Sequence, residues 1–259
     1  MSNKKRAKNN GWEAIFKEYK IEEHDFQKAP FELSAEEIKE ACQHLKRTGE
    51  KEVRILCTQT NREMRPDIFQ RLGLFMLPVR NGGYVIIQGE GYVDIPPIET
   101  PVVDYDSRLE FRPVSSFVGD SEMQHLDYAY AVSMVRHFME DKSLVLTIRG
   151  RKYTPEFSFR VGQFDITTKG VQTEVDSGYE GRERVVLIEA KNTKTLNTII
   201  RQLYYPYRQW KIQTKKDVSA LFFEKRVSGE YHFWEFVFDE EEDYNSIRLK
   251  KSARYKLRS

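Results

Sequence analysis

The chain has 259 residues, of which 39% are hydrophobic and 13% aromatic, so it can bury a sizeable core and is not a mostly disordered protein. Its 42 basic and 40 acidic residues leave a formal net charge of +2, which by itself says little about binding to nucleic acid. The two cysteines, Cys42 and Cys57, lack zinc-ligand spacing, and no apolar run reaches membrane-spanning length. We therefore expect a protein of a reducing compartment, the cytoplasm, without membrane association.

The first hundred residues predict a small α/β module. Residues 1–10 are polar and are expected to be mobile, and Ser34-Ala35-Glu36-Glu37 has the pattern of a capping box that opens a helix. Asn81-Gly82-Gly83 between two apolar runs is a strong hairpin signal. The expected helices are residues 11–20, 34–47 and 65–73, and the expected strands are residues 53–57, 74–77 and 84–87.

Two helices followed by a hairpin resemble a winged helix, although an ordinary α/β packing module fits the same pattern. A winged helix would offer side chains of its second helix region to a DNA groove, namely Arg62, Arg65, Asp67, Gln70 and Arg71. Residues 89–101, which contain Pro96-Pro97 and Pro101, are the best candidate for a linker. We therefore predict a recognition module over residues 1–100 and a second domain over residues 101–259.

The second domain is expected to alternate between helices and strands. The expected helices are residues 122–139 and 196–211, and the expected strands are residues 109–114, 144–149, 157–161, 164–167, 218–223 and 231–238. Residues 150–152 are expected to be a turn between strands. The basic residues between 248 and 258 are expected to be a solvated tail or to contact phosphates.

The most informative stretch is a predicted hairpin, residues 172–179 and 185–191. The first run alternates between apolar and polar residues, and the second is β-branched and apolar until Glu189-Ala190-Lys191. Side chains two residues apart share one face of a strand, so Glu189 and Lys191 point the same way. If the strands pair about residues 182 and 183, Asp176 lies opposite Glu189, whereas an earlier turn makes the two carboxylates diagonal neighbours.

Two carboxylates and an ammonium crowded at one end of a sheet indicate a metal site. Like charges placed opposite each other destabilise a sheet, and Mg²⁺, which prefers oxygen ligands, removes this conflict. Lys191 beside such an ion is placed to hold an attacking water, which suits hydrolysis of a phosphodiester.

Asp176 followed by Glu189-Ala190-Lys191 resembles the core motif of the PD-(D/E)XK nucleases, and among them the type II restriction endonucleases. The resemblance runs from about residue 120 to residue 240. Glu-x-Lys alone is a weak signal, since it also occurs at Glu18/Lys20, Glu37/Lys39 and Glu140/Lys142, but only Glu189/Lys191 ends a β-type run with an acidic strand before it. Val175 stands where the motif has its frequently absent proline. The competing interpretation is a surface ion pair at a sheet edge.

The resemblance implies an α+β fold in which a mixed sheet is flanked by helices. It also implies a Mg²⁺ cofactor held by Asp176, Glu189 and the carbonyl of Ala190, with Lys191 as the third catalytic residue. Further residues are candidates for supporting roles, namely Glu174, Glu122 and Gln202. Besides the residues offered to a DNA groove by the N-terminal module (Arg62, Arg65, Gln70 and Arg71), the candidates for contacts with the DNA backbone are Arg149, Arg151, Lys152, Arg201 and Arg208. Each of these residues also has an ordinary structural explanation, such as a solvated turn or an amphipathic helix.

We therefore expect a sequence-specific, Mg²⁺-dependent endonuclease of double-stranded DNA in a prokaryotic cytoplasm. Its products would carry 5′-phosphate and 3′-hydroxyl ends. Cleavage of both strands of a palindrome requires two active sites, hence a homodimer, and a separate DNA methyltransferase would protect the host. The alternatives are a repair, junction-resolving or nicking nuclease of the same superfamily, and a non-catalytic DNA-binding regulator.

Overall fold

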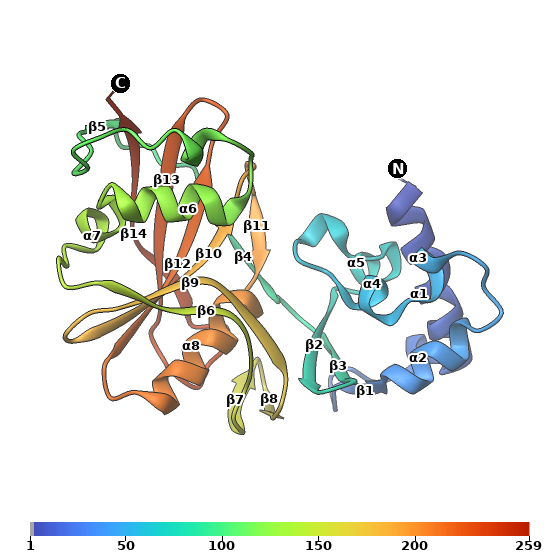
Figure 1. Cartoon of the computed structure of the whole chain (residues 1–259). Helices are drawn as coiled ribbons and strands as arrows, with labels where there is room; N and C mark the ends of the chain where they lie inside the picture. The colour runs from blue at the N-terminus through green and yellow to red at the C-terminus, as the bar shows by residue number, and fades with distance from the viewer. Residues whose placement is uncertain (1–2, 259) are drawn as a thin grey trace.

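The computed structural model describes residues 3–258 and has two lobes, with the N-terminal lobe at the right of Figure 1. The N-terminal lobe contains a three-stranded sheet, and the larger lobe contains a seven-stranded mixed sheet with helices on both faces. The expected class, a mixed sheet flanked by helices, is confirmed. Within the described residues, none of the helices combines the length and the apolar character needed to cross a bilayer.

The N-terminal lobe packs helices against one antiparallel sheet of order β1-β3-β2. Its elements are α1 (Asn3–Glu18), β1 (Phe31–Ser34), α2 (Ala35–Cys42), α3 (Thr48–Lys51), α4 (Val53–Cys57), the short 3₁₀ helix η2 (Arg62–Met64), α5 (Asp67–Arg71), β2 (Leu74–Arg80) and β3 (Gly83–Gln88). The predicted hairpin is present as β2 and β3, and Gly82 occupies its turn with φ +69°, a conformation that glycine adopts without strain.

Three expectations for this lobe are wrong. Helix α1 begins at Asn3, so residues 3–10 are helical rather than mobile, and residues 1–2 lie outside the described part of the chain. The capping box of Ser34 and Glu37 is present, but its helix ends at Cys42 instead of residue 47. Residues 53–57 form a helix, not a strand, because the apolar pair Val53 and Leu56 is buried at a spacing of three residues.

The large sheet has the order β5-β14-β13-β12-β10-β9-β6. Its strands are β5 (Val103–Tyr105), β6 (Val145–Tyr153), β9 (Gln172–Glu180), β10 (Arg184–Lys191), β12 (Asp217–Lys225), β13 (Glu230–Phe238) and β14 (Ile247–Leu257). The helices of this lobe are α6 (Glu122–Ala131), α7 (Met134–Met139) and α8 (Arg201–Gln213). Two further sheets have two short strands each: β4 (Tyr92–Asp94) pairs with β11 (Asn197–Ile199), and β7 (Phe157–Val161) pairs with β8 (Phe164–Thr168). Helices α6 and α7 cover one face of the sheet and α8 covers the other (Figure 1).

The structure also corrects the predicted order of the larger lobe. Residues 109–114, which are all described, are not a strand, and residues 150–152 are not a turn but part of β6, where Gly150 has φ +79°. The predicted helix of residues 122–139 is interrupted at Ser133, whose φ of +67° is incompatible with a continuous helix. Strands β7 and β8 pair only with each other in the described sheets and do not continue the large sheet. Residues 197–199 of the expected helix 196–211 form β11, which pairs with β4 from the expected linker 89–101. The basic C-terminal stretch is the sheet strand β14.

One hydrophobic core joins the two lobes. Side chains of β2 and β3, among them Phe75 and Ile87, are buried together with Leu203 and Tyr205 of α8 and with Trp234 of β13. A second core lies under α6 and α7, and a third belongs to the N-terminal lobe alone. The shared core holds the N-terminal lobe against α8, the helix that follows the candidate catalytic strand.

Candidate active site

The hairpin of β9 and β10 brings the predicted acidic residues together. The antiparallel register runs from Val185↔Glu180 to Ile188↔Ser177, so the next position would place Glu189 opposite Asp176. The ladder ends before this pair, and the Oδ2 atom of Asp176 accepts a hydrogen bond of 2.8 Å from the backbone N–H of Ala190. The two carboxylates are therefore neighbours at the end of the paired strands, as the alternation of residues predicts.

A β-bulge in β9 directs the side chain of Asp176 toward Ala190 and Glu189 of β10. Ile148 of β6 pairs with Gly178 and Gly150 pairs with Val175, so two steps along β6 correspond to three steps along β9. The extra residue lies at positions 176–177. A β-bulge of this kind changes the direction of the side chains beyond it, which explains how Val175 packs with the buried residues of β10 while Asp176 also reaches β10.

Lys191 and Gln202 complete a hydrogen-bonded cluster around Glu189. The Nζ atom of Lys191 donates to Oε1 of Glu189 at 2.5 Å and to the carbonyl of Ala190 at 2.8 Å. The Nε2 atom of Gln202, in the first turn of α8, donates to the same Oε1 atom at 2.6 Å. Gln202 is held in turn by the hydroxyl of Thr198, which donates to its Oε1 atom at 3.0 Å.

Burial shifts the protonation of both carboxylates. Desolvation raises the pKa of Glu189 to about 7, with Lys191 opposing the shift and the charges of Asp176 and Glu122 adding to it. Desolvation also raises the pKa of Asp176, although the N–H of Ala190 and the ammonium of Lys191 lower it. Burial alone would lower the pKa of Lys191, but the attraction of Glu189 and the other carboxylates raises it, so its ammonium form is favoured. The cluster therefore holds two acids whose ionised forms need more positive charge than Lys191 supplies.

The donor set fits a hard divalent cation. Residues 3–258 contain no group of three or more His, Cys, Asp or Glu side chains that can hold a metal ion, but the predicted set is two carboxylates and one carbonyl. Two of its oxygen atoms, Oε1 of Glu189 and the carbonyl oxygen of Ala190, already converge on one positive charge, the Nζ atom of Lys191. Asp176 contributes the third oxygen from the adjacent strand. Oxygen ligands of this type are those that Mg²⁺ prefers.

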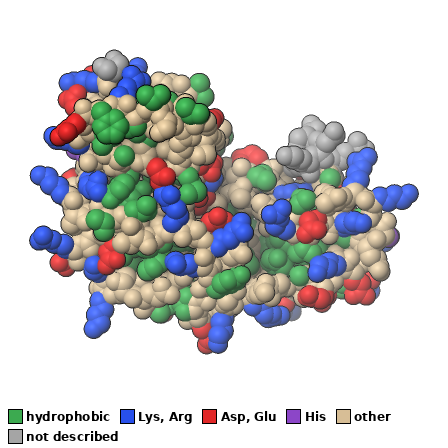
Figure 2. All heavy atoms as spheres, viewed as in Figure 1, with side chains coloured by type: hydrophobic (Ala, Val, Ile, Leu, Met, Phe, Trp, Pro, Cys, Tyr) green, Lys and Arg blue, Asp and Glu red, His purple; other side chains and the backbone are tan. Residues whose placement is uncertain are grey.

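The cluster opens into a cavity of about 360 Å³ with a mainly polar lining. The lining residues come from both lobes and are Arg54, Thr58, Arg151, Gln172, Thr173, Glu174, Asp176, Glu189, Arg201, Gln202 and Pro206. The space-filling view shows a notch between the two lobes, and basic and acidic side chains are interspersed on the visible face (Figure 2). The visible face therefore has no single large basic surface, and the basic groups that can attract an anionic ligand there include the arginines of the cavity.

The predicted supporting residues occupy different places. Gln202 contacts Glu189 directly. Glu174 is exposed at the cavity, where its carboxylate pairs with Nε of Arg151 at 3.4 Å. Glu122 is the first residue of α6, and its charge contributes to the raised pKa values of both Glu189 and Lys191.

Of the predicted DNA-binding residues of the larger lobe, Arg151 and Arg201 line the cavity. Lys152 follows Arg151 in β6 and is partly exposed. Arg149 is instead paired with Asp127 of α6. Arg208 is buried, 6% of its side chain being exposed, and donates to the carbonyl of Glu241 at 2.9 Å, so its guanidinium is not presented to a ligand.

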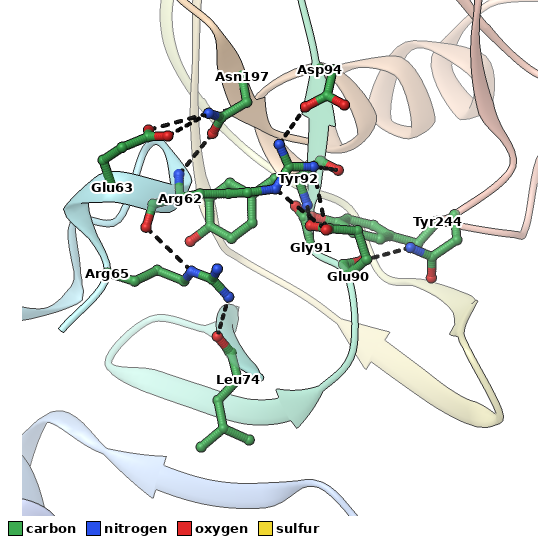
Figure 3. A network of polar contacts seen from close by, with 11 residues as sticks. Arg62, Glu63, Arg65, Leu74, Glu90, Gly91, Tyr92, Asp94, Asn197 and Tyr244 are labelled. Carbon is green, nitrogen blue, oxygen red and sulfur yellow. Dashed lines mark hydrogen bonds and ion pairs between the residues drawn. The ribbon is translucent and has the colours of Figure 1, made fainter. Parts of the chain in front are cut away.

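The predicted DNA-binding residues of the N-terminal lobe make contacts within the protein. Arg62 donates to Glu90 and Asp94, and Arg65 donates to the carbonyl of Leu74 at 3.0 Å (Figure 3). Gln70 donates to the carbonyl of Arg65 at 2.9 Å, and Arg71 pairs with Glu22. None of these four residues lines the cavity in the part of the chain that the structure describes.

Sequence reasoning missed Arg54 and Thr58, which line the cavity from the other lobe. They lie in and directly after residues 53–57, for which a buried strand was expected. Within a helix, Arg54 stands on the polar face while its neighbours Val53 and Leu56 are buried. The sequence offered only a single arginine in a short apolar run, and the expectation of a buried strand gave no reason to place that arginine at a site.

Comparison with known families gives two matches, both to domains without an assigned function. The family model described as domain of unknown function DUF6997 matches residues 87–256, and the one described as domain of unknown function DUF6996 matches residues 9–86. No curated protein and no solved structure matches the chain. The border between the two matches falls within β3, before the linker expected at residues 89–101.

Proposed function

The chain belongs to the DUF6997 family, a domain of unknown function, and we propose that it is a Mg²⁺-dependent endonuclease of double-stranded DNA. The observation that carries the proposal is the cluster of Asp176, Glu189 and Lys191, whose two carboxylate residues line a polar cavity. One buried carboxylate (Glu189), one partly exposed carboxylate (Asp176), a converging carbonyl and the partly exposed ammonium of Lys191 suit metal-assisted hydrolysis of a phosphodiester.

The order and direction of the strands support a PD-(D/E)XK core. In the sheet, β6, β9 and β10 are each antiparallel to the next, and β12 runs parallel to β10. Along the chain these strands follow α6 and α7, with the short pair β7 and β8 between β6 and β9, and β11 and α8 come between β10 and β12. This matches the α-βββ-α-β order that the motif implies. The acidic residues stand at the end of β10 and in the bulge of β9, where such a core would carry them.

The residues have distinct proposed roles. Asp176, Glu189 and the carbonyl of Ala190 would hold the Mg²⁺ ion, which when bound offsets negative charge on the phosphate and favours ionisation of a water. The ammonium of Lys191, which contacts Glu189 and the carbonyl of Ala190, would orient the attacking water by a hydrogen bond. Arg151 and Arg201 on the cavity wall face the phosphodiester. The expected products carry 5′-phosphate and 3′-hydroxyl ends.

The N-terminal lobe supports a role in DNA recognition. Helices, the antiparallel order β1-β3-β2 and the glycine-turned hairpin of β2 and β3 fit a winged helix. The helix that the sequence favoured for docking is α5, but Arg62, Arg65 and Arg71 near it bind other groups of the same chain. We therefore propose sequence-specific binding through this lobe without assigning it to α5.

A restriction enzyme of type II is the form of this activity that we propose. Two active sites are needed to cut both strands of a palindromic site, so a homodimer is part of the proposal, as is a separate methyltransferase that protects the host DNA. The test is digestion of supercoiled plasmid and of a mapped linear DNA with Mg²⁺, with EDTA as the control. Discrete fragments support the restriction enzyme, nicked circles or preference for branched DNA would indicate a nicking or junction-resolving nuclease, and specific binding without cleavage would indicate a regulator.

The pKa of Glu189 predicts how the requirement for Mg²⁺ depends on pH. Below its pKa of about 7 the carboxyl group is protonated and must release a proton before it binds a cation. We expect the Mg²⁺ concentration for half-maximal cleavage to fall about tenfold per pH unit up to about pH 7 and then to level off. Initial rates over a grid of pH and Mg²⁺ concentration measure this, with metal-free DNA binding at each pH as the control. A requirement that does not change with pH would contradict the assignment of Glu189.

Replacement of Gln202 tests its role as a positioning residue. Gln202→Leu removes one of the two hydrogen bonds to Oε1 of Glu189 and should lower cleavage by about 10- to 100-fold. Loss of a donor to the carboxylate raises its pKa, so the pH at which the Mg²⁺ requirement levels off should move upward. Gln213→Leu, at the exposed end of α8, is the matched control and should change neither quantity. If the pH profile of Gln202→Leu is unshifted, Gln202 does not position the carboxylate of Glu189 and only packs beside it.

A further inference from the structure

The cavity beside the acidic cluster has walls from both lobes, and two of its arginines have guanidinium groups without a polar partner among residues 3–258. Arg151 pairs with Glu174, whereas Arg54 and Arg201 have no hydrogen bond or ion pair from their guanidinium groups to any described residue. Arg54 comes from α4 of the N-terminal lobe and Arg201 from the first turn of α8. Two unpaired guanidinium groups next to a phosphodiester site are available to bind phosphate oxygens.

A second cavity of about 390 Å³ adjoins the first and extends toward the hairpin of β2 and β3. Four residues line both cavities, namely Arg54, Thr58, Gln172 and Arg201. These four residues therefore lie where the two cavities meet. A polyanion that extends across both cavities would therefore contact Arg54 and Arg201.

The segment that follows Arg54 is fixed to the larger lobe. The backbone N–H of Ile199 donates to the carbonyl of Thr60 at 2.9 Å, and Asn197 bridges the N–H of Arg62 and the carboxylate of Glu63 (Figure 3). These contacts tie the chain just after Arg54 to β11, which leads directly into the helix that carries Arg201.

The guanidinium of Arg62 reinforces the same junction. It lies between Glu90 and Asp94 and also donates to the carbonyl of Tyr92 (Figure 3). Together with the hydrophobic core shared by β2, β3 and α8, this network sets the distance of the N-terminal lobe from the acidic cluster. Arg54 thus lies in a helix held at the wall of the cavity that Asp176 and Glu189 also line.

We propose that Arg54 of the N-terminal lobe and Arg201 of the larger lobe together bind the DNA backbone at the entrance to the acidic cluster, so that the active site is shared between the two family domains. The inference deepens the proposed nuclease function and rests on it for the identity of the ligand. It makes Arg54 a substrate-binding residue that the DUF6997 region alone would lack.

The test is metal-free binding of a labelled DNA duplex as a function of salt concentration. Arg54→Ala should weaken binding by about tenfold and reduce the slope of log affinity against log salt by about one, the value for one lost phosphate contact. Lys51→Ala is the matched control, because it removes the same charge three residues earlier from an exposed position that lines neither cavity. Arg201→Ala should behave like Arg54→Ala.

Binding and cleavage are scored separately to distinguish the two proposals. If Arg54→Ala and Lys51→Ala have the same slope, or if the wild-type protein does not bind duplex DNA, the proposed binding of the DNA backbone by Arg54 and Arg201 is refuted. If the slope changes as expected but the wild-type protein does not cut DNA with Mg²⁺, the proposed DNA binding by Arg54 and Arg201 is supported and the nuclease proposal fails. In a protein that cuts, Arg54→Ala should raise KM for DNA more than it lowers kcat.

Discussion

Replacing Lys191 by alanine is expected to lower DNA cleavage by about 1000-fold, because the change removes the only ammonium that contacts Glu189 and the carbonyl of Ala190 among residues 3–258. The charge and the donor would be lost from the position where the attacking water is oriented. Asp176→Asn should cause a loss of similar size, since it removes one negative ligand but keeps an oxygen that can accept the hydrogen bond from Ala190. Initial rates on a plasmid at saturating Mg²⁺ measure both effects.

The sequence itself provides a matched control. Glu140 and Lys142 repeat the same Glu-x-Lys spacing, but both are exposed, and neither lines the cavity. Lys142→Ala should therefore cleave like the wild-type protein, and circular dichroism should show that all three variants are folded. Cleavage by Lys191→Ala at the rate of Lys142→Ala would show that the hairpin cluster is a structural ion pair.

Replacing Tyr205 by alanine is expected to destabilise both lobes together by about 3–5 kcal/mol. Tyr205 is fully buried in the shared core, its ring packs on Phe157 and Phe159, and its hydroxyl donates to the carbonyl of Pro78 in β2 at 2.9 Å. The substitution leaves a cavity and an unpaired carbonyl at the junction of the lobes. Urea unfolding followed by tryptophan fluorescence measures the loss.

The form of the unfolding transition is also informative. Trp12 reports on the N-terminal lobe and Trp234 on the larger sheet, and both are fully buried. With one shared core, we expect a single transition for the wild-type protein. Tyr153→Ala, at a residue that is 63% exposed, is the control and should cost less than about 1 kcal/mol. Two separate transitions would show that the lobes fold independently and would remove the physical basis for a rigid junction.

The site was predictable where local patterns determine it. Spacing of two in Glu189-Ala190-Lys191 fixes a shared strand face, and a turn near residue 182 predicts a register in which Asp176 and Glu189 are opposite or diagonal neighbours. Gln202 was proposed only from the resemblance to the nucleases, and its place in the first turn of α8 was not predicted, because the expected helix began at residue 196. In contrast, the bulge that directs Asp176 has no pattern of its own in the sequence, since it depends on how β6 packs beside β9.

The errors have physical causes as well. Residues 53–57 were read as a strand because a five-residue apolar run fits a buried strand and a buried helix equally, and tertiary packing decides between them. The basic stretch 248–258 resembles a solvated tail, yet pairing with β13 over most of its length makes it a strand. Arg208 was read as a phosphate ligand because burial is not visible in sequence, and its guanidinium instead packs over Phe157 and pairs with Glu241.

Crystals of the protein soaked in Mn²⁺, examined by anomalous diffraction, test most directly whether this hairpin binds a catalytic divalent ion. We expect one strong peak at about 2.0–2.2 Å from carboxylate oxygens of Asp176 and Glu189 and from the carbonyl of Ala190, with the ammonium of Lys191 moved off that carbonyl. The same soak of Asp176→Asn crystals should weaken or remove the peak. Absence of a peak in the wild-type crystals, or a peak held by other residues, would contradict the assignment of the active site.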